Sequence, residues 1–400
     1  MKKFTRLYSI LLFIAAILAG CDIKKNKEVK PEKEFLKIYD DQSFSNSYIP
    51  VDLKQTSDGG YIILAKTRIS ASAFYGIYLL KADKQGNFVS QQLLPDYLVS
   101  PTNSLMQVGQ DFYFFGMDGV TLESTLIKVD ENGVATAVQQ LSGILYPLST
   151  SQDEAGNFVL QSYDRDNLQT MVSTVTPAGN IQNTASYDIG IGGFDAEQPI
   201  IDHLTGNGKA LPFLSGSLGN GTYYFNGFYN YTFSLVFFNF GSTASPGVLQ
   251  GYKDERCISS VLYLTDINKF ALSGYAYGNN TIYSSATVAF NAGAVASSSD
   301  LTGFSIPEFN ADARVILKQE NLDGKNTLIY GSDTRSGQIA LYFYEASTGN
   351  FLSSKHLGYS NTFQFGNMIK TTDGGLAIVG VTYLSGRFPR LCLYKISSDS

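Results

Sequence analysis

The chain has 400 residues with 29 basic and 35 acidic side chains, so its formal net charge is −6. An acidic chain without a basic patch beyond its first 33 residues is a poor candidate for binding nucleic acid. The sequence contains only two histidines and no His, Cys and carboxylate cluster of metal-ligand spacing, which argues against a metal site or a serine–histidine–aspartate nucleophile. We therefore expect no metal, no cofactor and no catalytic residues.

Residues 1–20 form a predicted export signal. Three positive charges within residues 1–6 precede an apolar stretch at 7–18 that is too short to span a bilayer comfortably. The stretch ends in Leu18-Ala19-Gly20-Cys21, which resembles the lipobox of bacterial lipoproteins. This resemblance implies that the signal is cleaved before Cys21 and that Cys21 is acylated. Two or three long acyl chains hold a protein to a membrane essentially irreversibly.

Residues 21–33 form the predicted link between the lipid and the folded part. The stretch after Cys21 is rich in lysine and glutamate and has almost nothing apolar to bury, which is typical of a flexible, solvated tether. Cleavage of the signal would leave a net charge of about −9, because three basic residues lie within it. We expect a lipid-anchored protein of the outer membrane. Asp22 is followed by Ile23 and lysines rather than by further acidic residues, so the periplasmic and the surface-exposed face both stay open.

Residues 34–400 are predicted to form one all-β domain. Short runs rich in Tyr, Phe, Ile, Val and Thr alternate with Gly, Asn and Asp turns, with almost no helical periodicity. One predicted strand-to-strand turn recurs seven times, at 58–60, 110–111, 155–157, 206–208, 267–268, 323–326 and 373–375. A second series of turns follows the first six further along the chain, at 84–87, 131–133, 177–180, 241, 293 and 348–350.

This recurrence predicts a β-propeller. Units of about 50 residues with four short strands are typical of propeller blades, and seven units are present. The last unit supplies only three strands, at 366–369, 376–381 and 390–396, and a fourth is available at 34–39. Pairing of this N-terminal strand with the last unit would close the ring and remove an exposed edge. We predict seven four-stranded blades, with six or eight as alternatives because the fourth and fifth units are long and irregular.

Two of the units carry a clearer motif. The segments Gln55–Leu64 and Lys370–Gly380 both contain Thr-x-Asp-Gly-Gly, and each is followed by a strand that ends in lysine, Leu79-Leu80-Lys81 and Leu393-Tyr394-Lys395. These units resemble the DGG-type propeller repeats of secreted and lipid-anchored proteins of the Bacteroidota. The resemblance implies the fold much more firmly than any function.

The motif also resembles the Asp-box turn of sialidases, but the aromatic residue expected three places later is Ile63 or Ile378. We predict that Asp58 and Asp373 accept backbone hydrogen bonds within their own turns. The turns at Asp83 and Asp130 faintly suggest calcium loops, but neither supplies five or six oxygen ligands.

The remaining cysteines and histidines are predicted to be structural. Cys257 and Cys392 lie in apolar, strand-like runs and are expected to be buried small hydrophobic residues, with a disulfide between them as the alternative. His203 and His356 lie far apart in the sequence and are expected to be ordinary turn or strand residues.

One segment, Gly219–Phe240, is unusually aromatic. Ten of the eighteen residues at 223–240 are Tyr or Phe, against 13% in the whole chain. Part of the segment is predicted to pack in the core, whereas rings at a hairpin tip favour recognition of a partner. The candidate partner- or ligand-binding residues are Tyr223, Tyr224, Phe228, Tyr229 and Tyr231.

The sequence thus favours a non-catalytic outer-membrane lipoprotein. We expect a protein-interaction scaffold or an accessory subunit of an outer-membrane complex for uptake, secretion or assembly, with an envelope protein as its partner. The alternative is a glycan-binding protein or a glycoside hydrolase that uses aromatic platforms, because paired carboxylates from distant blades would not show as a motif. A quinone-dependent dehydrogenase is disfavoured by the lack of tryptophan and of metal ligands.

Overall fold

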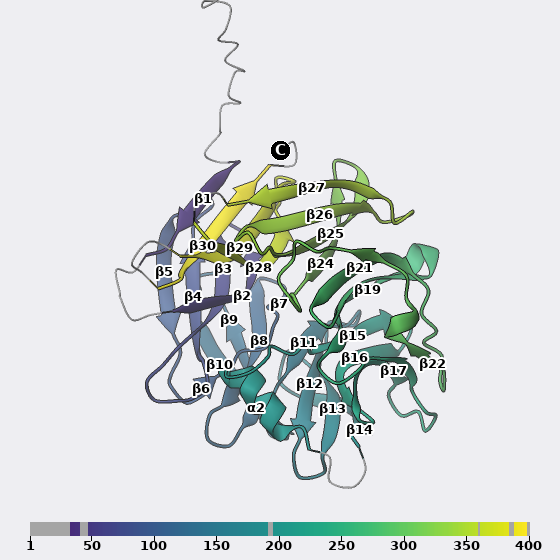
Figure 1. The fold of residues 1–400 in the computed structure, drawn as a ribbon. Coiled ribbons are helices and arrows are strands. Elements are labelled where there is room, and N and C mark those ends of the chain that lie inside the picture. Colours follow the sequence, from purple (N-terminus) through teal and green to yellow (C-terminus); the bar gives the residue numbers. More distant parts are fainter. Residues whose placement is uncertain (1–32, 41–46, 191–194, 359–360, 384–387, 398–400) are drawn as a thin grey trace, which may run out of the picture.

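The computed structural model describes residues 33–40, 47–190, 195–358, 361–383 and 388–397. The predicted signal, Cys21 and nearly all of the tether lie outside the described residues. Strands dominate the described chain, and they are arranged around a common middle (Figure 1). No helix in the described ranges is long and apolar enough to cross a bilayer.

The strands fall into four-stranded antiparallel sets in chain order. The first set comprises β2 (Tyr48–Gln55), β3 (Tyr61–Thr67), β4 (Gly76–Ala82) and β5 (Phe88–Leu93). The second comprises β7 (Met106–Val108), β8 (Asp111–Asp118), β9 (Glu123–Val129) and β10 (Ala135–Leu145). The short strand β6 (Leu98–Val99) pairs with both β4 and β8, so these two sets form one continuous sheet. The third comprises β11 (Ser149–Gln152), β12 (Phe158–Asp164), β13 (Gln169–Val175) and β14 (Ile181–Asp188).

The next three sets follow the same plan. The fourth comprises β15 (Leu214–Gly219), β16 (Thr222–Tyr229), β17 (Thr232–Asn239) and β18 (Gly247–Gln250), with β22 (Val295–Ser297) added in parallel to β18. The fifth comprises β19 (Arg256–Leu264), β20 (Lys269–Ala276), β21 (Asn279–Ala286) and β23 (Phe304–Ser305). The sixth comprises β24 (Ile316–Leu322), β25 (Lys325–Asp333), β26 (Ile339–Glu345) and β27 (Phe351–Leu357).

The last set joins the two ends of the chain. It comprises β28 (Phe363–Lys370), β29 (Leu376–Thr382) and β30 (Arg390–Ile396), and β1 (Phe35–Ile38) lies antiparallel to β30 with Phe35 opposite Lys395. The inner strand β28 also contacts β2 of the first set. These pairings are those expected for seven blades closed by the N-terminal strand, and the blade number and ring closure stay predictions.

Burial explains why these segments form strands in this order. Every residue of β4 and of β29 is buried, because a strand in the middle of a blade packs against neighbouring blades on both faces. The outer strands β5 and β14 are mostly exposed; β14 is largely polar, whereas β5 exposes Phe88, Val89 and Leu93. The core therefore consists of apolar clusters between adjacent sheets, for example Tyr61 and Ile63 of β3 with Val379 of β29.

One of the predicted turns is wrong, and a second leads to a strand of another set. Residues 206–208 do not join two strands, because Gly206 ends the helix α2 (Glu197–Thr205) in a left-handed conformation. The hairpin of the fourth set lies instead at Asn220 and Gly221, between β15 and β16. The turn at Gly293 does not lead to the outer strand of the fifth set, because the β22 strand that follows pairs with β18 of the fourth set.

The helix α2 is the main departure from the expected all-β pattern. Pro199 lies in its first turn, where a missing backbone N–H is tolerated. Ile200 and Leu204, one helical turn apart, are buried in an apolar cluster that also contains residues from the second to fifth sets, including Phe213 and Tyr275. The helix therefore lies across one face of the propeller (Figure 1).

Candidate functional site

The Thr-x-Asp-Gly-Gly turns are structural. Oδ1 of Asp58 accepts hydrogen bonds from the backbone N of Gly60 at 2.9 Å and from the hydroxyl of Thr56 at 2.5 Å. The ammonium of Lys81 approaches the same oxygen at 3.2 Å. The Thr56 hydroxyl is the main cause that holds the pKa of the Asp58 carboxyl below its usual value. The carboxylate is engaged within its own turn, as predicted.

The second copy of the motif has the same geometry. Asp373 accepts hydrogen bonds from the Thr371 hydroxyl at 2.6 Å, from Lys395 at 2.7 Å and from the backbone N of Gly375 at 3.4 Å. Burial alone would raise the pKa of Asp373, but the hydrogen bonds from Lys395 and Thr371 outweigh it and lower this pKa. Asp83 and Asp130 likewise accept backbone N–H groups of their own turns.

The aromatic candidates lie on the hairpin of β16 and β17. Its tip is formed by Asn230 and Tyr231, both with positive φ, and Tyr231 is exposed. Phe228 is buried in the apolar cluster beneath α2. Tyr223, Tyr224 and Tyr229 are half-buried and pack against core clusters. The structure thus brings the five residues together on one hairpin, and of these five only the Tyr231 ring is exposed; their binding of a partner stays a prediction.

The two later cysteines are buried, and each of the two histidines contacts a neighbouring residue of the fold. Cys257 and Cys392 are free and buried. His203 is a residue of α2, not of a turn or strand, and its Nδ1 accepts a hydrogen bond from the backbone N of Leu211 at 2.9 Å. His356 on β27 lies 3.1 Å from a carboxylate oxygen of Glu308. Within the described ranges, no three His, Cys, Asp or Glu side chains are grouped in a way that could hold a metal.

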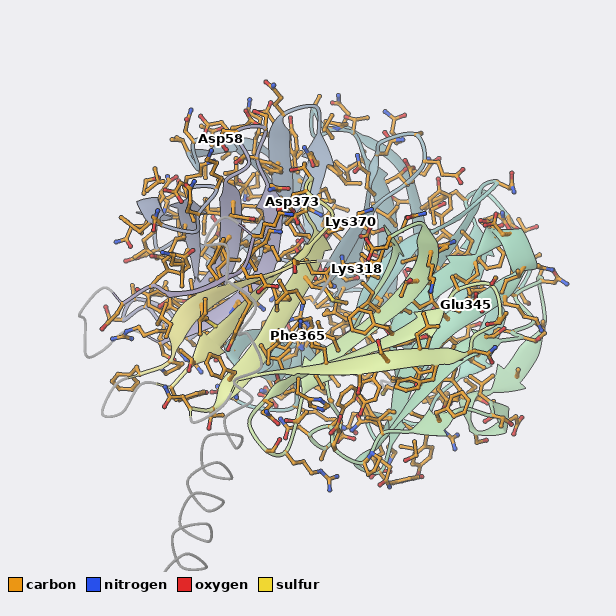
Figure 2. All side chains as sticks on the ribbon, turned by 90° about the horizontal axis from the view of Figure 1, so that it is seen from above. Asp58, Lys318, Glu345, Phe365, Lys370 and Asp373 are labelled. Carbon is orange, nitrogen blue, oxygen red and sulfur yellow. The ribbon has the colours of Figure 1, made fainter. Side chains whose placement is uncertain are left out.

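A cluster of basic side chains lies on and beside the inner strands, around the middle of the propeller. We name it the axial basic cluster, and its members are Lys54 on β2, Lys66 on β3, Arg314 just before β24, Lys318 on β24 and Lys370 on β28. Figure 2 shows Lys318 and Lys370 near the middle of the molecule, on two strands that contact each other. Arg314 reaches across to β2, where Nη2 lies 3.5 Å from the carbonyl oxygen of Val51.

The charges of the cluster act on one another. Burial and the nearby Arg314 guanidinium lower the pKa of Lys66 to about 8. Burial lowers the pKa of Lys318 as well, and the positive charges of Lys54 and Arg314 add to this effect against the attraction of Asp52 and Glu320. Burial together with Lys66 and Arg314 lowers the pKa of His203 to about 3, so His203 adds no charge at neutral pH.

Three acidic side chains lie among these bases, and half of their carboxylate oxygens accept backbone hydrogen bonds. Both carboxylate oxygens of Asp52 accept backbone hydrogen bonds, from Leu53 at 2.8 Å and Leu105 at 2.7 Å. Asp333 accepts a hydrogen bond from the backbone N of Phe365, and burial raises its pKa to about 6. Glu320 is half-buried, and burial raises its pKa against the attraction of nearby lysines.

The bases are therefore not neutralised by close contact. Lys54, Lys66 and Lys318 have no ion-pair partner among the described residues, whereas Lys370 donates to the backbone carbonyl of Asn321. Arg314 is exposed and the three lysines are half-buried, so water reaches this part of the molecule. An arrangement of five bases around three acids can attract an anionic group by charge and by hydrogen bonds from the ammonium and guanidinium groups.

The sequence did not reveal this cluster. It showed no basic patch beyond the tether, because Lys54 and Lys66 belong to the first set of strands and Arg314 and Lys318 to the sixth. The one available signal was the position of lysines on predicted inner strands, such as Lys54 just before the turn at Asp58.

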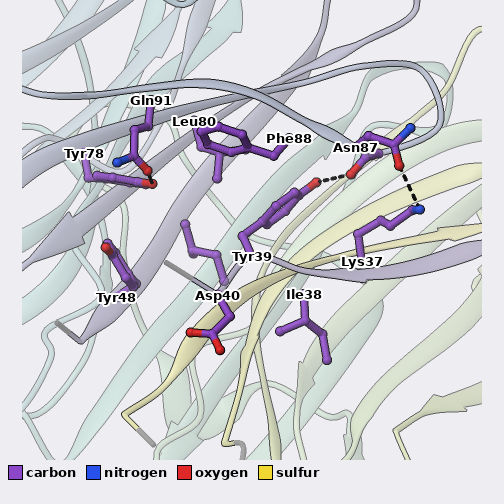
Figure 3. A pocket seen from close by; sticks show the side chains of 12 residues that line it. Lys37, Ile38, Tyr39, Asp40, Tyr48, Tyr78, Leu80, Asn87, Phe88 and Gln91 are labelled. Atoms are coloured by element: carbon purple, nitrogen blue, oxygen red, sulfur yellow. Dashed lines mark hydrogen bonds between the residues drawn. The ribbon is translucent and has the colours of Figure 1, made fainter. Parts of the chain in front are cut away.

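A second feature is a groove at the rim of the propeller, between β1 of the last set and β4 and β5 of the first (Figure 3). Its volume is about 550 Å³. Lys37 donates to the side chain of Asn87 at 2.9 Å, and Tyr39 donates to the carbonyl oxygen of Gly86 at 3.0 Å, so β1 is fastened to the first set. The exposed ring of Phe88 and the amide of Gln91 also line the groove.

Comparison with known proteins identifies the fold. No family model matches the chain, and no curated protein is significantly similar to it. Virginiamycin B lyase from Staphylococcus aureus is similar in structure with a TM-score of 0.50 at 9% identity, over 91% of this chain and 99% of that one. A streptogramin B lyase gives 0.48 at 11% identity, over 90% and 97%. The β-propeller domain of the Trilobed protease from Pyrococcus furiosus gives 0.46 at 10%, over 88% and 94%. At these identities the similarity shows an all-β propeller fold and gives no information about activity.

Proposed function

We propose that this protein is a non-catalytic, lipid-anchored interaction module of the outer membrane, and that its axial basic cluster binds an acidic segment of a partner protein. The observation that carries the proposal is the gathering of five basic side chains in a chain whose net charge is −6. Placing several positive charges close together in half-buried positions is unfavourable for folding, because the charged groups lose hydration and repel one another.

The unfavourable burial of these positive charges supports a binding function. Lys66 and Lys318 have lowered pKa values because burial disfavours their charged forms, and neither lysine forms an ion pair with a described residue, although Asp52 and Glu320 partly offset the effect at Lys318. Groups with strongly shifted pKa values are typical of functional sites. A bound segment with several carboxylates would supply the missing partners and would gain charge-assisted hydrogen bonds.

The sequence supports the anchor. Cys21 with the preceding lipobox-like residues is expected to carry the lipid, and the first strand of the propeller begins at Phe35. A fully extended link of this length spans at most about 50 Å, so a lipid on Cys21 would keep the propeller close to the membrane surface. The resemblance to the DGG-repeat lipoproteins of the Bacteroidota also supports a lipid-anchored propeller.

The test is affinity purification of the tagged full-length lipoprotein from its native membrane in mild detergent. We expect a stoichiometric envelope-protein partner with the wild type, and loss of this partner with the Lys54→Gln/Lys318→Gln double variant. The matched control is Lys84→Gln/Lys325→Gln, which removes two exposed lysines of hairpin turns. Tyr231→Ala tests the exposed ring of the β16–β17 hairpin as a further contact. Retention of the partner by the Lys54/Lys318 variant would refute the assigned binding site.

The rim groove favours a second candidate, a glycan-binding protein. Phe88 is 54% exposed and lies beside the amide groups of Asn87 and Gln91, so an aromatic face and hydrogen-bonding groups are combined there. A sugar ring needs both kinds of contact, an apolar face to stack on and amides for its hydroxyl groups. A glycan array with the wild type and Phe88→Ala tests this candidate. A glycan that binds the wild type but not Phe88→Ala supports it, and no binding of any glycan by the wild type contradicts it.

A further inference from the structure

A small cavity lies between β19, β20 and β21 and the short helix η2 (Ser298–Asp300), apart from the axial basic cluster. Its volume is about 230 Å³. Polar lining comes from Arg256, Ser298 and Ser299, whereas Ile258, Leu301 and three tyrosines supply apolar and aromatic walls. One of these tyrosines, Tyr277, is 64% exposed, so the cavity reaches the surface beside it.

Three polar groups of the residues that line this cavity lack a hydrogen-bond partner among the described residues, and one of them is the hydroxyl of Tyr275. The Nε of Arg256 and the Oγ of Ser298 are both buried and make no hydrogen bond to any described residue. Ser298 as a whole is only 5% exposed. A buried donor without an acceptor is costly, and in native proteins such groups are usually satisfied by water or a ligand.

The side chains that line the cavity indicate which kind of hydrogen-bond acceptor would fit there. A guanidinium has only donors, and a serine hydroxyl donates readily to an anion. No carboxylate belongs to the residues that line the cavity. Arg256 also has no ion pair with a described residue. The planar guanidinium of an arginine presents N–H groups that match the two oxygens of a carboxylate. These oxygens have further lone pairs that can accept a hydrogen bond from the serine hydroxyl.

We propose that this cavity binds a small organic monocarboxylate, held by Arg256 and Ser298, with its apolar or aromatic body between Tyr277, Tyr283 and Leu301. The volume lies below that of pockets for drug-sized ligands, so a compound of the size of benzoate is the upper limit. The site is independent of the acidic-segment proposal, since none of its residues belongs to the axial basic cluster.

The test uses the full-length protein and three probes, acetate, butyrate and benzoate, with benzamide as the neutral analogue of benzoate. Binding is followed by calorimetry and by saturation-transfer NMR. We expect saturable binding of at least one carboxylate, with benzamide weaker by about tenfold or more. Arg256→Gln is expected to weaken carboxylate binding by at least about tenfold, and Ser298→Ala by a smaller factor. The control is Arg165→Gln, a half-exposed arginine of the third set that is paired with Glu197.

Ser298→Ala keeps the test decisive if Arg256→Gln fails to fold, because the Ser298 hydroxyl makes no hydrogen bond whose loss would disturb the structure. Weaker carboxylate binding by folded Ser298→Ala supports the site. The proposal is overturned if none of the three carboxylates binds, if benzamide binds as tightly as benzoate, or if both cavity variants bind like the wild type. Binding of a glutamate peptide to the axial basic cluster is expected to be the same in Ser298→Ala as in the wild type, so failure of one proposal does not mimic failure of the other.

Discussion

The ammonium of Lys395 lies 2.7 Å from Oδ1 of Asp373, and this contact links the third strand of the last set to the turn between its first two strands. Lys81 and Asp58 make the equivalent contact in the first set. The two lysines are almost fully buried, with 3% and 6% of their side chains exposed. The repeat motif in the sequence, Thr-x-Asp-Gly-Gly followed by a Leu-x-Lys strand, is therefore a structural unit of the blade.

Removal of the acid from this unit is expected to destabilise the protein. Asp373→Ala leaves the Lys395 ammonium buried without its carboxylate, which we expect to cost about 2 kcal/mol, at the low end for such pairs because Asp373 is partly exposed. Urea unfolding measures the difference. The double variant Asp373→Ala/Lys395→Met is expected to recover most of the loss, and unchanged stability of the single variant would contradict the assignment.

Replacement of a cluster lysine is expected to have the opposite effect. Lys318→Met removes a positive charge whose pKa is lowered by burial, so the variant is expected to be more stable than the wild type by about 1 kcal/mol. Lys325→Met, at an exposed position of the β24–β25 hairpin, is the control and is expected to change little. A destabilised Lys318→Met would mean that the lysine contributes to the fold rather than to binding.

The half-buried histidine His203 is expected to make the protein sensitive to acid. The pKa of His203 is about 3 in the folded state and about 6.5 in an unfolded chain, so between these values only the unfolded state takes up the proton. Stability is unaffected by this group above pH 6.5 and decreases as the pH falls toward 3, by about 1 to 2 kcal/mol at pH 5.

His203→Asn tests this directly, because an asparagine oxygen can accept the hydrogen bond from the backbone N of Leu211 without being protonated. Urea unfolding at several pH values is expected to show a smaller loss of stability between pH 6.5 and 5 than in the wild type. Equal pH dependence of the two proteins would show that His203 is not held neutral.

The aromatic hairpin is expected to divide into packing and surface residues. Phe228→Ala removes a buried ring from the cluster beneath α2 and is expected to cost about 3 to 4 kcal/mol. Tyr231→Ala at the exposed tip is expected to cost less than about 1 kcal/mol. Thermal or urea unfolding of both variants separates the two cases, and a severe effect of Tyr231→Ala would place that ring in the core.

The sequence was sufficient for the strands and most turns, because a blade strand is marked by continuous apolar residues and its turn by Gly, Asn or Asp. It was not sufficient for α2, whose nine residues carry a proline and only a short apolar stripe, and whose terminal Gly206 resembles a strand turn. The axial basic cluster was hidden for a different reason. Its members become neighbours only when the inner strands of distant units meet, and such proximity leaves no local pattern.

The most direct test of the proposed function is a titration of the full-length protein with a short glutamate peptide and with a glutamine peptide of the same length, at low and high salt. We predict that only the glutamate peptide binds, that salt weakens its binding, and that Lys54→Gln/Lys318→Gln weakens it by about tenfold or more, whereas Lys84→Gln/Lys325→Gln does not. Equal affinity of the wild type and the Lys54/Lys318 variant for the glutamate peptide would contradict the claim that the axial basic cluster binds an acidic partner.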